Sequence, residues 1–365
     1  MRARTAALLL IALLLLVQVA PAEAATSTYK YTETYTFENR GTAPATLMRD
    51  DIAVPLFLSN EFQTITITSS SPSLGAPYAD EDGNMLSDPN TSLTIPPGGK
   101  VVITVTYQIE SSDVSVPALS LSSAGGAGDI PASLVSQYTG TTSTFWADDP
   151  EIADLARNLT ANEPTVLAKV ARLVRWFNAN VTYQNHEIPL MPDQTLSQLE
   201  GDCDDQSILL ISMLRSLGIP AYLEIGIVFN SGISGEDTYW DGHLKIKETG
   251  LAWHGWAMVY TPPWGWIPVD LTLVSDNDPL QMIKKAPQYS APVVTAMKIS
   301  EQTYTTAGEE TRQRIIDSTI YISSVETAEG VQAGWINQTM ILLAVGISAA
   351  VAIMFYTSRR RQQPI

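Results

Sequence analysis

The chain has 365 residues and a formal net charge of −17, from 38 acidic against 21 basic residues. Such acidity argues against nucleic acid and anionic lipid surfaces as partners. The single cysteine, Cys203, excludes an internal disulfide. One cysteine and three histidines are also too few for a zinc cluster, so we expect no metal and no cofactor.

The first residues have the pattern of an export signal. Arg2 and Arg4 precede an apolar run from Ala6 to Val19, and the small-x-small sequence Ala22-Glu23-Ala24 follows it. This order predicts a secretory signal peptide at residues 1–24, with a retained N-terminal anchor as the alternative. We therefore expect the segment that follows to be exported.

A second apolar segment lies near the C-terminus. Residues 336–356 contain no charged side chain, and at about 1.5 Å per residue they would span about 30 Å, enough for the hydrocarbon core. Arginines at 359–361 follow at once and mark the cytoplasmic side. The sequence predicts a single-pass cell-membrane protein with an external N-terminal ectodomain. A C-terminal strand and juxtamembrane segment at 301–335, a transmembrane helix at 336–356 and a cytoplasmic tail at 357–365 would follow it.

Period-two alternation dominates residues 25–118. Aromatic residues at 29, 31, 35 and 37, and aliphatic residues at 101, 103 and 105, alternate with polar ones, and turn sequences separate the runs. Short strands at this spacing predict an N-terminal β-sandwich domain. Asp80, Asp82 and Asn84 have a spacing that fits a hairpin turn better than an EF-hand calcium loop.

Helical periodicity begins after a segment rich in Ser, Gly and Ala, which predicts a linker at residues 119–140. A stripe formed by Val166, Val170, Leu173, Val174 and Phe177 predicts an amphipathic helix that faces a core. Helices followed by strands indicate an α+β domain over residues 141–300.

The surroundings of Cys203 favour a reactive thiol. The run from Ile208 to Leu217 is strongly apolar, Asp202 is a good N-cap, and Gly218 is a good C-terminal stop. Cys203 would then lie in the first helical turn, where the helix dipole lowers the pKa of a thiol. Carboxylates at 204 and 205 oppose this effect, and we interpret them as residues that complete the helix N-terminus.

A base for the thiol is predicted by a hairpin. Two apparent strands, the first beginning at His254 and the second ending at Asp270, flank a turn at Pro262. Folding the hairpin about Pro262 places His254 opposite Asp270, with Cβ atoms about 5 Å apart. A carboxylate beside an imidazole fixes its tautomer and stabilises its charged form. His243 is the competing base, but it has no acidic partner in a comparable register.

These segments resemble the transglutaminase-like superfamily, which has a papain-like fold. The resemblance rests on the runs Gly201-Asp202-Cys203-Asp204-Asp205-Gln206-Ser207, Leu214-Arg215-Ser216-Leu217-Gly218-Ile219-Pro220-Ala221, His254-Gly255-Trp256-Ala257-Met258-Val259 and Trp264-Gly265-Trp266-Ile267-Pro268-Val269-Asp270-Leu271-Thr272. It implies a catalytic triad with Cys203 as nucleophile, His254 as base and Asp270 as orienting residue. Leu271 stands where a proline is common in the family.

The resemblance covers about residues 147–272 and implies a thiol enzyme that acts on amide or peptide bonds, by hydrolysis or acyl transfer through a thioester. We expect a protein or peptide substrate at the cell surface. The alternative is a non-catalytic binding or scaffold protein that uses the β-sandwich and a transglutaminase-like cleft. Glycosylation is a further expectation, because Asn-x-Ser/Thr sequons begin at Asn90, Asn158, Asn180 and Asn337.

Overall fold

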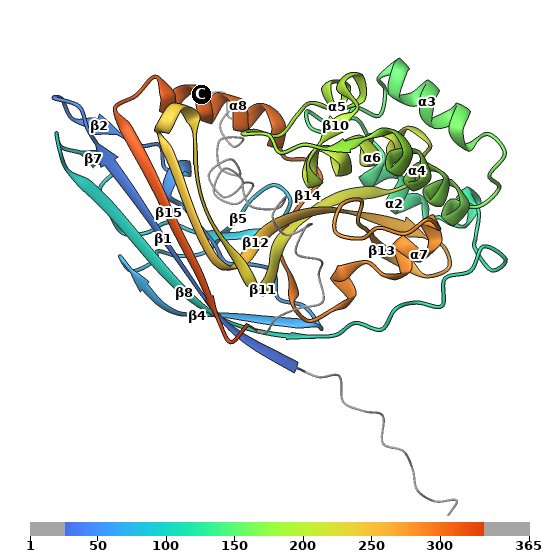
Figure 1. Cartoon of the computed structure of the whole chain (residues 1–365), viewed down its shortest axis with the longest axis horizontal. Coiled ribbons are helices and arrows are strands. Elements are labelled where there is room, and N and C mark those ends of the chain that lie inside the picture. The colour runs from blue at the N-terminus through green and yellow to red at the C-terminus, as the bar shows by residue number, and fades with distance from the viewer. Residues whose placement is uncertain (1–25, 332–365) are drawn as a thin grey trace, which may run out of the picture.

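The largest sheet has eight strands in this computed structural model, which describes residues 26–331 (Figure 1). In spatial order its strands are β14 (Val293–Ile299), β11 (Ala221–Tyr239), β12 (Leu244–Thr261), β15 (Ile320–Glu329), β1 (Thr26–Asn39), β8 (Lys100–Ser112) and β4 (Gln63–Ser71), with β13 (Gly265–Val269) paired to β12. Strands β12 and β15 pair in parallel, and the other neighbours are antiparallel.

Short strands complete the β structure. They are β2 (Ala45–Thr46) with β7 (Thr94–Ile95), β3 (Val54–Pro55) with β6 (Met85–Ser87) and β5 (Tyr78–Ala79), and β9 (Thr182–Tyr183) with β10 (Glu200–Gly201). Short 3₁₀ turns occur at η1 (Asp50–Ile52), η2 (Ala127–Asp129), η3 (Trp240–Gly242) and η4 (Pro287–Tyr289).

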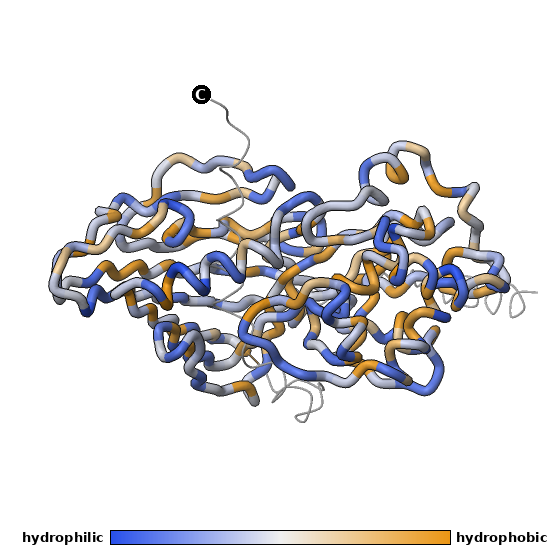
Figure 2. Tube along the Cα trace, turned by 90° about the horizontal axis from the view of Figure 1, so that it is seen from above, coloured by the Kyte–Doolittle hydropathy of each residue, from blue (hydrophilic) through white to orange (hydrophobic). Residues whose placement is uncertain are grey.

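The N-terminal strands form because their apolar residues recur at every second position. On β1, Tyr31, Glu33, Tyr35 and Phe37 are buried, while the threonines that alternate with them are partly exposed. Figure 2 shows this alternation of hydrophobic and hydrophilic residues along the strands at one end of the molecule. A two-residue period places alternate side chains on one face of a sheet, so the predicted strands in this segment are present.

The sequence predicts a β-sandwich at 25–118 and a separate domain at 141–300, but in the structure the two parts are joined by strand pairing. Strand β15, from the C-terminal part of the chain, pairs with β1 on one side and with β12 on the other. One hydrophobic core includes buried residues of both parts. The segment predicted to be a linker, residues 119–140, also contacts the turn between β12 and β13, since the Gly125 amide donates to the Pro262 carbonyl at 2.8 Å. Strands from both parts therefore belong to the same eight-stranded sheet.

Most of the helices gather at the other end of the molecule, beside β11 and β12, whereas α8 lies apart from them near β15 and η3 (Figure 1). The helices are α2 (Ala132–Tyr138), α3 (Pro150–Thr160), α4 (Val166–Asn180), α5 (Pro192–Gln198), α6 (Cys203–Ser216), α7 (Pro279–Lys284) and α8 (Tyr304–Ile316). The predicted apolar stripe lies on α4, where all five of its residues are buried. This confirms the interpretation of that stripe as core.

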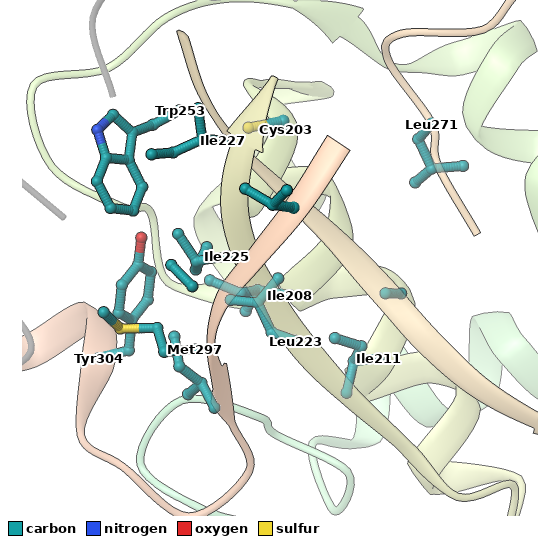
Figure 3. Packing of buried hydrophobic residues seen from close by; sticks show 14 of the residues in the cluster. Cys203, Ile208, Ile211, Leu223, Ile225, Ile227, Trp253, Leu271, Met297 and Tyr304 are labelled. Carbon is teal, nitrogen blue, oxygen red and sulfur yellow. The ribbon is translucent and has the colours of Figure 1, made fainter. Parts of the chain in front are cut away.

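Helix α6 is the centre of the helical part. Its residues from Cys203 to Arg215 are all buried, because α3, α4, α5 and the β11–β12 surface surround it. Side chains such as Ile208 and Ile211 belong to the same buried cluster as Leu223 of β11 (Figure 3). Burying each such side chain contributes about 1.5–3 kcal/mol, so α6 is held firmly in place.

The acidic sequence at residues 80–84 forms the predicted hairpin turn, between β5 and β6. The Asp80 carboxylate accepts from the amides of Asp82 and Asn84 at 3.0 and 2.8 Å. The Asp82 carboxylate accepts from the amides of residues 300, 301 and 302, so it links the turn to the segment after β14.

Three of the predicted segments lie outside the described residues: the signal peptide at 1–24, the membrane span at 336–356 and the tail at 357–365. Within residues 26–331, no helix is both long enough and apolar enough to cross a bilayer.

Candidate active site

Cys203 is the first residue of α6, as the sequence predicts. Its N-cap, Asp202, and the residue three positions into the helix, Asp205, exchange side-chain to backbone hydrogen bonds in a capping box. This exchange satisfies two amides that the helix itself leaves unpaired. The predicted role of Asp205 at the helix N-terminus is therefore confirmed, and the cap fixes the position of the Cys203 backbone.

Strand β12 approaches the thiol closely. The Gly255 amide donates a hydrogen bond to Cys203 Sγ at 3.2 Å. A Cβ atom at Gly255 would lie 3.0 Å from both Asp204 Cβ and Ile225 Cδ1, so a larger residue would push the strand away from α6. The glycine thus permits the contact, and it places the preceding residue, His254, beside the nucleophile's helix.

His254 and Asp270 form the predicted pair. His254 Nε2 lies 2.7 Å from Asp270 Oδ2, and both side chains are almost completely buried. The register differs from the prediction by two residues: β12 and β13 pair Ala257 with Val269 and Thr261 with Gly265, so Trp256 continues the register to Asp270. Since residues two apart share a face of a strand, His254 still reaches Asp270 diagonally.

Several groups hold the Asp270 carboxylate. Its Oδ1 accepts from the amides of Thr272 and Leu273, both at 2.9 Å, and its Oδ2 also accepts from Gln288 Nε2 at 2.8 Å. Burial raises the pKa of Asp270, but its interactions with His254 and the hydrogen bonds from Gln288 and Leu273 outweigh burial, and the pKa is lowered. Asp270 is therefore ionised at neutral pH and orients His254.

The thiol itself differs from the prediction of a lowered pKa. Cys203 is only 2% exposed, and burial raises the pKa of its thiol well above the ordinary value. The charges of Asp204 and Asp202 raise this pKa further. The Gly255 hydrogen bond acts in the opposite direction. The sequence shows a helix N-terminus and a neighbouring histidine, but the complete burial that dominates the thiol comes from tertiary packing.

The acidic residues next to the thiol share the same enclosed space. Asp204 Oδ2 accepts a hydrogen bond from Tyr304, of α8, at 2.7 Å. Burial is the largest cause that raises the pKa of Asp202, and it raises that of Asp205 to about 8, with the charge of Asp204 adding to both shifts. Sequence reasoning missed Tyr304, because no local pattern links it to residue 204.

A cavity of about 310 Å³ opens beside His254. Its walls combine apolar side chains at the end of α4 with the loop after Asp270. The lining residues include Phe177, Val181, Tyr183, Gln206, Leu273 and Asp276. Gln206 lies one helical turn after Cys203 and donates to the Gly201 carbonyl at 2.8 Å. The cavity therefore joins the base to the N-terminal turn of α6, and a substrate could enter there.

His243, the competing base, has a structural role. Its Nδ1 lies 2.8 Å from the Ile320 carbonyl oxygen, and its ring stacks on Tyr321 with the centroids 4.2 Å apart. Both partners belong to β15, whereas His254 lies in the second half of β12. The structure thus brings Cys203, His254 and Asp270 together and leaves His243 outside the site.

Comparison with known proteins agrees with this geometry. Residues 153–271 match the family model described as the transglutaminase-like superfamily. A solved structure of a candidate cysteine protease from Cytophaga hutchinsonii is 14% identical, with 84% of this chain and 90% of that chain covered and a TM-score of 0.50. No curated protein matches the chain.

Two further solved structures are also similar. The periplasmic domain of TgpA from Pseudomonas aeruginosa is 15% identical over 69% of this chain and 91% of that chain, with a TM-score of 0.36. Red sea bream transglutaminase is 10% identical over 70% of this chain and 49% of that chain, with a TM-score of 0.30. Residues 153–271 thus match the transglutaminase-like superfamily, and the chain shares its fold with the Cytophaga protein.

Proposed function

We propose that the protein is a thiol enzyme that cleaves or transfers amide or peptide bonds through a thioester on Cys203. The observation that carries the proposal is the arrangement of the three residues. The amide of Gly255 contacts Cys203 Sγ, and the adjacent His254 is bound through Nε2 to Asp270. A nucleophile, a base and an orienting carboxylate in this order are the parts that nucleophilic catalysis needs.

In the first half of the reaction the thiol attacks a carboxamide. Because Nε2 of His254 is bound to Asp270, Nδ1 is the nitrogen that takes the proton from Cys203. The sulfur forms a bond to the carbonyl carbon, and the negative charge that develops on the carbonyl oxygen is stabilised by amides at the N-terminus of α6. The C–N bond then breaks, and His254 returns the proton to the departing amine.

The second half releases the acyl group. Water or an amine loses a proton to His254 while it attacks the thioester. The C–S bond then breaks, and His254 returns that proton to the sulfur, which restores the thiol and the base. The raised pKa of Cys203 fits a neutral thiol at rest that loses its proton only as the base removes it. The mixed walls of the cavity beside His254 favour an extended peptide segment as the acyl donor.

The second candidate is a binding or scaffold protein without catalysis. The observation in its favour is the burial of Cys203, since structural thiols are usually buried and inert. The two functions differ in one measurable property, which is whether the thiol forms a covalent intermediate.

Acylation of Cys203 is therefore the test. The full-length chain, purified in detergent, is incubated with an activated peptide ester and its intact mass is recorded. We expect a mass increase equal to one acyl group, reversed by hydroxylamine as a thioester requires, and lost in Cys203→Ala and His254→Ala. A folded wild-type chain that gains no acyl group from a panel of such esters would favour the scaffold function.

We also propose that this chemistry takes place at the outer face of the cell membrane, on a protein or peptide substrate. The support is the N-terminal export pattern and the arginines that follow residues 336–356. The sequon residues Asn90, Asn158 and Asn180 are all exposed, which is compatible with glycan attachment. Protease added to intact cells should remove the ectodomain; a protected ectodomain with an accessible tail would contradict this topology.

A further inference from the structure

The cavity beside the base lies on one side of the thiol. His254 and Gln206 line it, whereas Cys203 does not. In the proposed reaction the acyl carbon is bonded to Cys203 Sγ, and His254 gives its proton to the nitrogen of the departing amine. The amine half of the broken bond therefore lies on the His254 side of the sulfur, which is where the cavity is.

The size of the cavity bears on what that amine is. Its volume is about 310 Å³. A water molecule takes about 30 Å³ of liquid water, and ammonia is similar in size. A primary carboxamide releases ammonia, which would leave most of this space unfilled. The volume favours a secondary amide, whose departing amine is a whole amino-acid residue.

The walls favour an apolar side chain on that residue. Among the lining residues in the described part of the chain, Asp276 is the one carboxylate, and it already pairs with Lys285 at 2.7 Å. Its charge is therefore compensated before any substrate binds. The apolar residues of the wall are Phe177, Val181, Leu271, Leu273 and Val274.

Gln206 presents a free acceptor to the cavity. It lies three residues after Cys203, so both side chains project from the same side of α6. Its Nε2 donates to the Gly201 carbonyl at 2.8 Å, and because a carbonyl can only accept, Oε1 is the end that remains. Among the described residues Oε1 has no hydrogen-bond partner, and it is not closed off from solvent. Gln206 is only 4% exposed, and this small accessible part faces the cavity that it lines.

His254 presents a second acceptor to the same cavity. Its Nε2 is bound to Asp270, so the neutral ring carries its proton there and Nδ1 is left to accept. Among the described residues Nδ1 also has no partner and is not closed off from solvent. The nitrogen of a primary amine carries two hydrogens. Nδ1 of His254 can take one of them while Oε1 of Gln206 accepts the other as a hydrogen bond.

We propose that this cavity binds the amine side of the scissile bond as an apolar amino-acid residue, an assignment that rests on the proposed thioester function. Gln206 is then a specificity-determining residue, because its Oε1 accepts from the N–H of that residue. During cleavage the C–N bond breaks, and the nitrogen takes a proton from His254 while its own N–H stays on Gln206. During transfer an amine in the same place bonds to the thioester carbon and loses a proton to His254. The C–S bond then breaks, and that proton passes to the sulfur.

Acyl transfer measures the preference of the cavity. The full-length chain is acylated with an activated peptide ester at pH 9, where an α-amine is largely neutral. Leucinamide, glycinamide or glutamic acid α-amide is added as the acceptor, and the ratio of amide product to hydrolysed product is recorded. We expect leucinamide to reach half-maximal transfer at a concentration at least about tenfold below that of the other two, because its side chain is buried against apolar walls.

Two variants test the role of Gln206. Gln206→Leu removes the acceptor and should raise the half-maximal concentration of leucinamide about fivefold, the usual effect of one neutral hydrogen bond. A general disturbance of α6 would slow hydrolysis and transfer together and leave the product ratio unchanged. Gln198→Leu, the same change at the exposed end of α5, should have no effect. Equal half-maximal concentrations for the three acceptors, or equal effects of the two variants, would overturn the proposal.

Titration calorimetry separates the cavity assignment from the proposed function. The full-length Cys203→Ala chain cannot be acylated, and it should bind leucinamide about tenfold more tightly than glycinamide, with a loss of about fivefold when Gln206→Leu is added. This binding without acylation of the wild type would keep the assignment and contradict the enzyme. Acylation of the wild type without any preference among the amides would keep the enzyme and contradict the assignment, and the absence of both would contradict both.

Discussion

Gln288 Nε2 donates to the same oxygen of Asp270 that His254 Nε2 contacts, at 2.8 Å against 2.7 Å. The carboxylate therefore has two donors on one oxygen and two backbone amides on the other. This complete set of partners fixes the plane of the carboxylate, and through it the orientation of the imidazole. Gln288 is thus a positioning residue for the proposed reaction.

Replacing Gln288 tests this role. Gln288→Leu should slow acylation of Cys203 by a peptide ester about tenfold, since a hydrogen bond to a charged group contributes about 1.5–3 kcal/mol. Gln288→Glu should be slower still at pH 8, where two carboxylates repel, and should recover at about pH 5, where a protonated Glu can donate. If Gln288 had a purely structural role, both variants would lose the same fraction of the acylation rate at every pH.

The reactivity of Cys203 should depend on Asp204. Because burial and the Asp204 and Asp202 charges raise the pKa of the thiol, the rate of alkylation by iodoacetamide should reach half its maximum above about pH 8.5. Asp204→Asn keeps the size and can still accept from Tyr304, but removes the charge. We expect its midpoint to fall by about one unit.

The control for that measurement is Asp193→Asn, at an exposed position of α5, which should leave the midpoint unchanged. A wild-type midpoint well below 8 would show that the helix dipole and the base dominate over burial. Intact mass identifies the site, since Cys203 is the single cysteine of the chain.

Three buried glutamates lie side by side across the sheet. Glu33 of β1 is in register with Glu326 of β15, which is in register with Glu248 of β12. Tyr31 donates to both Glu33 and Glu326, and Tyr107 donates to Glu33. Burial, and then the charge of Glu326, raise the pKa of Glu33 from 4.5 to about 8.

This row makes stability fall at alkaline pH. The folded chain keeps a proton on Glu33 that the unfolded chain releases above about pH 4.5. The stability that the protonated group contributes is therefore full below about pH 4.5 and is lost as the pH rises through about 8. Glu33→Gln removes the ionisation. Compared with the wild type, this variant should therefore gain free energy of unfolding at pH 9 relative to pH 5, by at least about 1.4 kcal/mol. Denaturant titrations at both pH values measure this.

The matched control for the row is Glu110→Gln, at an exposed position of β8, which should show no such difference. A Glu33→Gln chain whose stability follows the wild type between pH 5 and pH 9 would contradict a buried proton on Glu33.

The continuous sheet predicts that the helical part does not fold alone. A fragment of residues 141–324 lacks β1 and the end of β15, so the β12–β15 edge loses its partner. We expect this fragment to be insoluble or to melt without a cooperative transition, whereas residues 26–331 melt as one unit. The measurement is unfolding of the fragment monitored by circular dichroism. Cooperative unfolding would contradict this prediction and support the two-domain organisation expected from the sequence.

Local sequence determined the parts of the site that depend on local physics. The apolar run after an N-cap predicts α6 with Cys203 in its first turn, and the spacing of His254 and Asp270 about a short turn predicts their pairing. The two-residue error in register did not matter, because positions two apart lie on the same face of a strand.

Tertiary structure decided the rest, because the remaining contacts join residues with no shared local pattern. Tyr304 and Asp204 are 100 positions apart in the chain, and β15 joins strands from both ends of it. The environment of the thiol depends on the same packing: a helix N-terminus favours the thiolate, but burial beside two aspartates favours the neutral thiol, and only the assembled core shows which effect is larger.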